Sequence, residues 1–243
     1  MPVQEGLIEV ALPQRHPLRP LEDFKGSLAQ RVYASLRQSI LSLNLRPGDI
    51  IRKPEICDVL GVSRSPVSEA VARLAAEHLV HVVPQAGTYV ARFSLDDIRE
   101  GAFLREALEL AAVERVAQTV TEDQLVQLRR NLRLQTALIE DDDFAGFYQT
   151  DSAMHELILT FTGFKRVATL ADTSWVHVNR ARQLILPAPG RIQATLTEHQ
   201  AIITAIEARE PQTARAATRQ HLGKLIGFLE PLALSRPDLF DPD

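Results

Sequence analysis

The sequence predicts a mainly α-helical protein with two parts of different character. Three observations support this prediction. Apolar residues make up 45% of the 243 residues and aromatic residues only 5%, which favours helices built on leucine and alanine over an all-β core. Amphipathic runs with apolar residues every three or four positions cover most of the chain. Only one short region, residues 79–92, contains runs typical of β-strands.

The composition also excludes several classes of protein. The single cysteine, Cys57, rules out an intramolecular disulfide and a zinc site made of several cysteines. No apolar run reaches the ~18 residues that a membrane span needs. Residues 1–20 contain four prolines and no continuous apolar stretch, unlike a signal peptide. We therefore expect a soluble, cytoplasmic protein without a membrane partner.

The N-terminal part begins with a proline-containing stretch, residues 1–24, for which we expect a flexible tail. Three amphipathic helices are predicted to follow it. Their expected ranges are 27–43, 54–60 and 64–77. Gly61 is expected to end the second helix and Ser63 to cap the third. Two short helices joined by such a turn form a helix-turn-helix.

A β-hairpin is predicted next, because two β-prone runs, 79–83 and 88–92, flank a turn that contains Pro84 and Gly87. Three helices and a hairpin in under 70 residues predict a winged helix-turn-helix domain over residues 25–92. This segment has 9 Lys and Arg against 5 Asp and Glu, whereas residues 93–243 have 16 against 22. A basic module joined to an acidic one indicates a polyanion-binding domain fused to a domain of another kind.

Residues 93–243 are predicted to form an all-α bundle of six helices that binds an effector and holds a homodimer. The expected helices are 95–119, 122–140, 144–161, 164–186, 196–208 and 211–230. Two helix starts have the spacing of a capping box, Thr121 with Gln124 and Thr195 with Glu198. The bundle is rich in Leu, Ala and Val, whereas two basic domains would repel each other. The bundle is therefore the expected dimer interface.

Candidate DNA contacts gather around the third predicted helix. Arg64 is the first residue of that helix, and the N-terminal end of such a helix would enter a major groove. Hydroxyl and basic side chains lie near Arg64 in the sequence. The residues that we expect to contact DNA are Arg52, Lys53, Ser63, Arg64, Ser65, Ser68 and Gly87. Gly87 lies at the tip of the hairpin and permits close approach of a phosphate. Each residue alone could be a capping or solvated side chain, and only the ordered set favours DNA binding.

Three segments of this domain resemble the GntR family of transcription regulators. They are Leu45-Arg46-Pro47-Gly48, Leu60-Gly61-Val62-Ser63-Arg64-Ser65-Pro66-Val67-Ser68-Glu69-Ala70 and Gly87-Thr88-Tyr89-Val90. The resemblance implies a transcription regulator in which Arg64 contacts DNA. The family usually has a DNA-contacting arginine where this chain has Ser68, so the chain departs from the family at one contact.

Four residues of the bundle predict a metal site. Asp151 and His155 are four residues apart and share one helix face. His199 lies eleven residues before Glu210 and His221 eleven residues after it, so two antiparallel helices that turn there would bring the histidines level. One carboxylate and three imidazoles inside a bundle have the donor types of a metal site. The alternative is that these histidines are core or surface residues without a ligand.

The segment Leu104 to Leu110 and this set of one Asp and three His resemble the ligand-binding domain of the FadR subgroup of GntR regulators, the FCD domain. The resemblance implies one divalent metal ion per subunit, held by Asp151, His155, His199 and His221, with a small carboxylate effector completing the coordination. Imidazole ligands suit Zn²⁺ and Ni²⁺, and the carboxylate also admits Mn²⁺.

Four residues are candidates for effector binding. Arg105 lies on an otherwise apolar helix face, where its guanidinium could bind a ligand carboxylate through two hydrogen bonds. An internal ion pair with a glutamate is the alternative for Arg105. Asn179, Arg180 and Arg182 are weaker candidates, because such polar residues usually face water.

The sequence therefore predicts a regulator that binds operator DNA as a homodimer, acts in the repressing mode common in this family, and responds to an organic acid. An alternative is a metal-dependent hydrolase with a DNA-binding appendage, because such a site can activate water. Its candidate bases, Glu156 and Glu198, each adjoin a predicted ligand and point about 100° away from it. No catalytic residue and no enzyme are therefore predicted. A structural DNA-binding protein would leave the Asp and His set unexplained.

Overall fold

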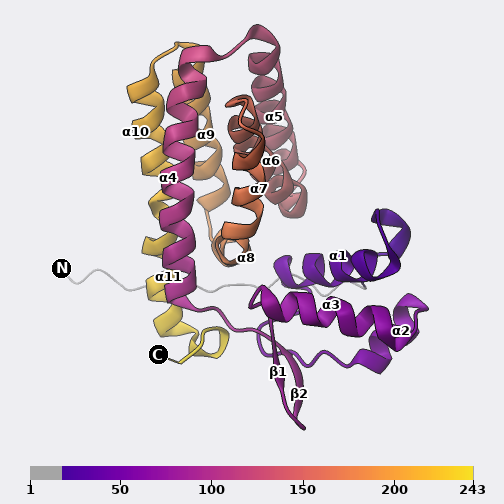
Figure 1. The fold of residues 1–243 in the computed structure, drawn as a ribbon. Helices are drawn as coiled ribbons and strands as arrows, with labels where there is room; N and C mark the ends of the chain where they lie inside the picture. Colours follow the sequence, from indigo (N-terminus) through magenta and orange to yellow (C-terminus); the bar gives the residue numbers. More distant parts are fainter. Residues whose placement is uncertain (1–17, 243) are drawn as a thin grey trace, which may run out of the picture. The chain divides into compact units, whose positions relative to one another are not determined.

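The computed structural model describes residues 18–242, and these residues form two compact units (Figure 1). The first, the winged unit, comprises residues 18–95 together with residues 236–242. The second, the helical unit, comprises Asp96–Ser235. Both units are dominated by helices. The predicted fold class, a winged helix-turn-helix followed by an all-helical domain, is confirmed.

The winged unit combines three helices with a hairpin. The elements are α1 (Leu28–Leu41), α2 (Lys53–Leu60), α3 (Arg64–Ala76), β1 (Val80–Val83) and β2 (Gly87–Val90). Ser27 begins α1 through a capping box with Gln30. Gly61 ends α2 with a left-handed backbone, φ 64°, which glycine adopts without strain. The strands pair antiparallel, with Val80 opposite Val90 and Val83 opposite Gly87.

The winged unit has a hydrophobic core of its own between α1 and α3. The fully buried side chains of this core are Val32, Leu36, Ile40, Val67, Ala70 and Leu74. They recur every three or four residues, so each helix presents one apolar stripe to the other. Burying each of the larger aliphatic chains contributes about 1.5–3 kcal/mol. The packing of α1 against α3 fixes the position of α3 within the winged unit.

The end of the chain also belongs to the winged unit. Residues 236–241, which we call the C-terminal strap, contain the 3₁₀ helix η2 (Pro237–Leu239). The N–H of Phe93 donates to the Leu239 carbonyl, and the N–H of Asp241 donates to the Phe93 carbonyl, both at 2.9 Å. The rings of Phe93 and Phe240 are buried with centroids 5.6 Å apart. The strap therefore packs against the winged unit at Phe93, just after the hairpin.

Most of the predicted N-terminal tail, residues 1–17 of 1–24, lies outside the described residues. The remainder contains a short 3₁₀ helix, η1 (Leu21–Asp23). The hydroxyl of Ser35, on α1, donates to the carbonyl of Arg19 at 2.9 Å. Residues 18–24 are thus attached to α1.

The helical unit contains eight helices within the described residues. They are α4 (Leu95–Thr119), α5 (Glu122–Glu140), α6 (Phe144–Phe161), α7 (Lys165–Ser174), α8 (Val176–Ile185), α9 (Arg191–Glu207), α10 (Pro211–Leu222) and α11 (Lys224–Ser235). Helix α5 packs against α6 and α9, and α9 packs against α10 (Figure 1). The predicted capping box of Thr121 and Gln124 is present at the start of α5. Across residues 18–242 we find no helix with the length and apolar character of a membrane span.

Two helices that were predicted to be continuous are interrupted. The predicted helix 164–186 breaks at Trp175, whose backbone (φ −106°, ψ 11°) is not helical. The predicted helix 211–230 breaks at Gly223, and α11 then continues beyond residue 230 through Pro231. Both predictions were wrong because apolar periodicity carries across a short break, so the pattern does not reveal it.

The start of α9 also differs from its prediction. The helix begins at Arg191, directly after Gly190 in a left-handed conformation (φ 72°), and not at residue 196. Thr195 is therefore inside the helix, where its hydroxyl donates to the Arg191 carbonyl at 2.9 Å. The predicted capping box of Thr195 and Glu198 is wrong, because the same spacing also occurs within a helix. The earlier start places Arg191 in the first turn of α9.

Candidate functional site

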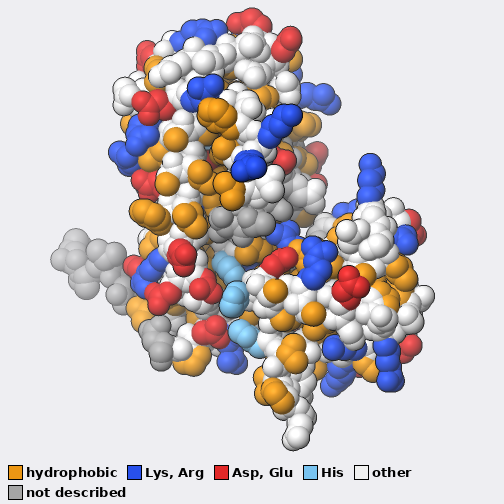
Figure 2. Space-filling view, viewed as in Figure 1, with side chains coloured by type: hydrophobic (Ala, Val, Ile, Leu, Met, Phe, Trp, Pro, Cys, Tyr) orange, Lys and Arg blue, Asp and Glu red, His pale blue; other side chains and the backbone are white. Residues whose placement is uncertain are grey.

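The residues predicted to contact DNA lie at the start of α3 and on the elements beside it. Arg64 is the first residue of α3, and Ser63 precedes it without making a capping hydrogen bond. The side chains of both residues are exposed, as are those of Ser65 and Ser68. Figure 2 shows Lys and Arg side chains on this face of the winged unit. An exposed helix start with a guanidinium and several hydroxyls is suited to a DNA groove.

Three other predicted DNA contacts lie on neighbouring elements. Arg52 directly precedes α2 and pairs with Glu55 at 3.1 Å, with both side chains exposed. Such an exposed pair is weak, so a phosphate can replace the carboxylate. Lys53 is the first residue of α2. Gly87 begins β2 with φ 138°, a conformation in which any side chain would be strained.

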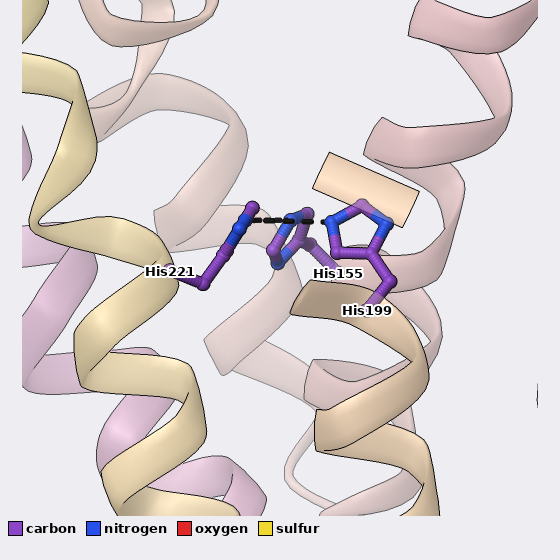
Figure 3. Close-up of side chains that lie close together, drawn as sticks. All are labelled: His155, His199 and His221. Atoms are coloured by element: carbon purple, nitrogen blue, oxygen red, sulfur yellow. Dashed lines mark hydrogen bonds between the residues drawn. The ribbon is translucent and has the colours of Figure 1, made fainter. Parts of the chain in front are cut away.

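Three histidines from three helices converge inside the helical unit (Figure 3). His155 lies on α6, His199 on α9 and His221 on α10. Nε2 of His221 is 3.3 Å from Nε2 of His155 and 3.4 Å from Nε2 of His199. All three side chains are buried. Because α9 and α10 pack together on either side of the turn at Glu210, His199 and His221 lie level.

Two of the imidazoles are oriented by carboxylates. Nδ1 of His155 donates to Oε2 of Glu109 at 2.6 Å, and Nδ1 of His221 donates to Oε2 of Glu198 at 2.7 Å. An ionised carboxylate only accepts hydrogen bonds, so each Nδ1 carries the proton. The Nε2 atoms of both histidines therefore present lone pairs to the centre of the cluster.

A chain of amides orients the third imidazole. The backbone carbonyl of Thr150 can only accept, and Nδ2 of Asn131 donates to it at 2.8 Å. Oδ1 of Asn131 then accepts from Nε2 of Gln135 at 2.7 Å, which turns Oε1 of Gln135 toward Nδ1 of His199 at 2.8 Å. Nδ1 of His199 must donate, so its Nε2 also presents a lone pair.

Burial keeps the three imidazoles neutral. It lowers the pKa of His221 to about 4 and lowers the pKa values of His155 and His199 below their usual value. Burial alone would raise the pKa of Glu198, but its bonds from His221 and Arg191 outweigh that effect and bring it to about 2. Three neutral imidazoles thus direct lone pairs at one another, an arrangement that a cation would stabilise.

Asp151 adds a carboxylate to the three nitrogens. Its side chain is fully buried, and Oδ1 accepts no hydrogen bond from the described residues. Oδ2 forms an ion pair with Arg182, and Oδ1 lies 3.3 Å from Nε2 of His199. A carboxylate that faces an imidazole lone pair is unfavourable without a cation between them. The three histidine nitrogens lie close enough together to hold one metal ion, and Asp151 is next to one of them, at His199.

The cluster borders a pocket lined by Arg105, Arg182 and Arg191 together with Asp151 and His221. Each arginine is paired with a carboxylate. Nε of Arg105 lies 2.6 Å from Oε1 of Glu109, and Arg191 binds Glu198 through two hydrogen bonds of 2.9 and 2.8 Å. Arg182 pairs with Asp151. The carboxylates that orient His155 and His221 are thus themselves held by arginines of the pocket.

The four predicted effector-binding residues have different positions. Arg105 and Arg182 line the pocket, whereas Asn179 and Arg180 are not among its lining residues. Arg180 is fully buried on α8, and the backbone carbonyl of Asn179 accepts from the hydroxyl of Tyr148. Arg182 lies two residues after Arg180, about 200° around the helix, and reaches the pocket instead.

Sequence reasoning did not identify several residues of this site. Glu109 and Gln135 contact the cluster from other helices, and Arg191 lines the pocket and pairs with Glu198 within α9. Only one signal was available, since Glu109 follows Arg105 by four residues, the spacing of a helical ion pair. Which face of each helix meets the cluster depends on packing that the sequence pattern does not encode.

Two family models match the chain. The model described as "FCD domain" matches residues 100–224, and the model described as "Bacterial regulatory proteins, gntR family" matches residues 28–90. The HTH-type transcriptional repressor RspR of Escherichia coli (strain K12) is 28% identical over 95% of this chain and 98% of its own. An HTH-type transcriptional regulator of Streptomyces ambofaciens is 32% identical over 87% of this chain and 89% of its own.

A solved structure of a GntR transcriptional regulator from Rhodococcus sp. RHA1 has a similar fold. The TM-score is 0.75 at 24% identity, and the match covers 84% of this chain and 98% of that one. At this level of identity the similarity shows the fold alone.

Proposed function

The chain belongs to the gntR family of bacterial regulatory proteins and carries an FCD domain, so it is a DNA-binding transcriptional regulator; we propose that it is a repressor controlled by a small organic acid at a metal centre in its helical unit. Repression is supported by the relative named as a repressor, which matches almost the whole chain. Operator DNA as the partner implies action in the bacterial cytoplasm.

The buried donor set carries this proposal. Three Nε2 lone pairs converge beside a pocket lined by arginines, and the Asp151 carboxylate contacts one of these nitrogens, Nε2 of His199. One divalent ion per subunit would be held by Asp151, His155, His199 and His221. Zn²⁺ and Ni²⁺ suit the imidazoles, and Mn²⁺ suits the carboxylate. When bound, the ion supplies a Lewis-acid position for an effector carboxylate, and Arg105 supplies guanidinium hydrogen bonds.

DNA recognition is proposed for the exposed start of α3. Arg64 is the residue that we expect to read a base edge, while Arg52, Lys53 and the backbone at Gly87 contact phosphates. Ser63, Ser65 and Ser68 supply hydroxyl donors on the same exposed segment.

A homodimer is proposed for the helical unit. Large apolar side chains are exposed on it, among them Phe103 on α4 at 73% and Leu170 on α7 at 52%. Figure 2 shows hydrophobic side chains gathered on one face of this unit. A second copy would bury such surface, and two DNA-binding domains would then reach two half-sites of an operator.

A metal-dependent hydrolase has weaker support from the geometry. Glu198 is bound to His221 and Arg191, and Glu156 is exposed on α6. Neither glutamate is positioned to take a proton from a water at the cluster. The same contacts give Glu198 a positioning role at His221.

The test combines metal analysis with DNA binding by the full chain. We expect protein loaded with Zn²⁺, Ni²⁺ or Mn²⁺ to hold about one ion per subunit, and carboxylate metabolites that raise its melting temperature to release operator DNA in gel-shift assays. Chelated protein should bind the same DNA without responding to the acid. An effector response that persists after chelation, or protein that takes up no divalent ion, would contradict the proposal.

A further inference from the structure

The pocket beside the histidine cluster has balanced charge before any ligand binds. Three arginines (Arg105, Arg182 and Arg191) face three carboxylates (Glu109, Asp151 and Glu198), and each pair is in direct contact. The imidazoles donate from Nδ1 and carry no second proton at Nε2, so they are neutral. The side chains of the site therefore have a net charge of zero.

A divalent ion bound to this site would leave two positive charges without a partner. The arginines and Asp151 are buried, at 4%, 6%, 7% and 0% exposure. Asp151 is the only carboxylate among the described residues that line the pocket, and it is already paired with Arg182. Uncompensated charge in a buried site is strongly unfavourable. The missing negative charge must come from the ligand.

Unused hydrogen-bond donors point to the same conclusion. Nη2 of Arg105 and Nε of Arg191 are buried without a hydrogen-bond partner among the described residues, and both side chains line the pocket. A buried cationic N–H that lacks an acceptor is unfavourable. A ligand with two anionic groups can bind the metal with one group and guanidinium donors with the other.

We propose that the effector is a dianion, a short acid with two negative groups, and that the arginine side of the pocket selects it over monocarboxylates. This inference rests on the proposed function and adds the charge class of the ligand. Free space in the pocket is about 30 Å³, so a long apolar chain has no room beside these side chains.

The test compares acids of equal shape and different charge. Full-length, metal-loaded protein is titrated calorimetrically with dicarboxylates of three to six carbons, such as malonate and succinate, and with their monoamides, malonamate and succinamate. Replacing one carboxylate by an amide removes one charge with little change in size. We expect the preferred dicarboxylate to bind at least tenfold more tightly than its monoamide, with a matching difference in melting temperature.

Substitutions at Arg191 test whether the arginine side of the pocket causes the preference for the dicarboxylate over its monoamide. Arg191→Gln should reduce the difference between the two acids to threefold or less, whereas Arg191→Lys, which keeps the charge, should retain most of it. Arg129→Gln serves as the matched control, because Arg129 is a partly exposed arginine of α5 that pairs with Glu207 and does not line the pocket. Metal content is measured in each variant, so that loss of the ion is not mistaken for loss of selectivity.

The outcomes separate this inference from the proposed function. If a monoamide or another monocarboxylate binds as tightly as the best dicarboxylate, the dianion assignment is wrong and the metal-anchored acid remains. If no acid in the series binds the metal-loaded protein, both are wrong. Equal selectivity in Arg191→Gln and the unchanged protein would overturn the role of the arginine side.

Discussion

At the residue scale, the direction of each imidazole lone pair is set by a side chain outside the cluster. Spacing in the sequence predicted that His199 and His221 would lie level, because that relation depends only on helix rise and one turn. The orienting residue Gln135 could not be predicted, because it comes from α5 and meets His199 only through packing between helices. The same limit applies to Glu109 on α4, which orients His155.

Gln135 provides a direct test of this orientation. Gln135→Leu removes the acceptor for Nδ1 of His199, so the imidazole is no longer held with its lone pair toward the centre. We expect metal affinity to fall roughly 10–100-fold, measured by competition with a chromophoric chelator. Gln127→Leu, an exposed position on the same helix, is the control. Equal affinities of the two variants would show that Gln135 does not position the ligand.

The buried histidines also predict a pH dependence for the metal-free protein. Their pKa values are lowered by burial, to about 4 for His221, whereas unfolded histidines titrate near 6.5. Between these values the unfolded chain binds more protons than the folded chain, so stability decreases as the pH falls from about 6.5 toward 4. Urea unfolding at several pH values with chelator present measures this loss. Stability that stays constant or increases as the pH falls from about 6.5 toward 4 would argue against buried, neutral histidines.

At the element scale, the residue at which a helix begins determines which side chains it places at a functional surface. This holds for α3 at the DNA-binding surface and for α9 at the pocket. Arg191 lies two turns before Glu198 only because α9 begins at residue 191 rather than 196. The sequence predicted the later start because the capping-box spacing at Thr195 resembles a helix beginning. The start of α3 was predicted correctly, because Gly61 and Ser63 mark the turn before it.

The exposed start of α3 predicts the effect of removing Arg64. Arg64→Ala should weaken operator binding by roughly 1–3 kcal/mol relative to random DNA if the guanidinium reads a guanine edge. Fluorescence anisotropy with both DNAs at fixed salt measures the ratio of affinities. Arg130→Ala, an exposed change on α5, is the control. An unchanged ratio in Arg64→Ala would remove the base-reading role.

The contact between the C-terminal strap and Phe93 predicts that a substitution near the end of the chain destabilises the winged unit. Phe240 is buried against Phe93, so Phe240→Ala should lower the free energy of unfolding of the winged unit by about 3 kcal/mol. Leu234→Ala, at a side chain 86% exposed, should change it by less than about 0.5 kcal/mol. Chemical unfolding followed by circular dichroism compares the two. Similar values for both variants would show that the strap does not stabilise this unit.

At the scale of the whole molecule, the described part of the chain, residues 18–242, passes between the two units twice, after Leu95 and after Ser235. The first passage leads into α4, which carries Glu109 beside His155, and the second leaves α11, which follows the helix of His221. Both passages therefore connect the histidine cluster to the winged unit through short stretches of chain. The sequence predicted the two kinds of domain but not the second passage, because no local pattern marks residues 236–241 as part of the winged unit.

The central claim is that the histidine cluster is a metal centre required for the effector response. Its most direct test is the metal content of a His199→Ala, His221→Ala double variant, measured by mass spectrometry beside the unchanged protein and a His81→Ala control at an exposed position on β1. We predict about one divalent ion per subunit in the unchanged protein and the control. The double variant should hold almost none, yet still bind operator DNA through its separately packed winged unit. Full metal occupancy in the double variant would contradict the account.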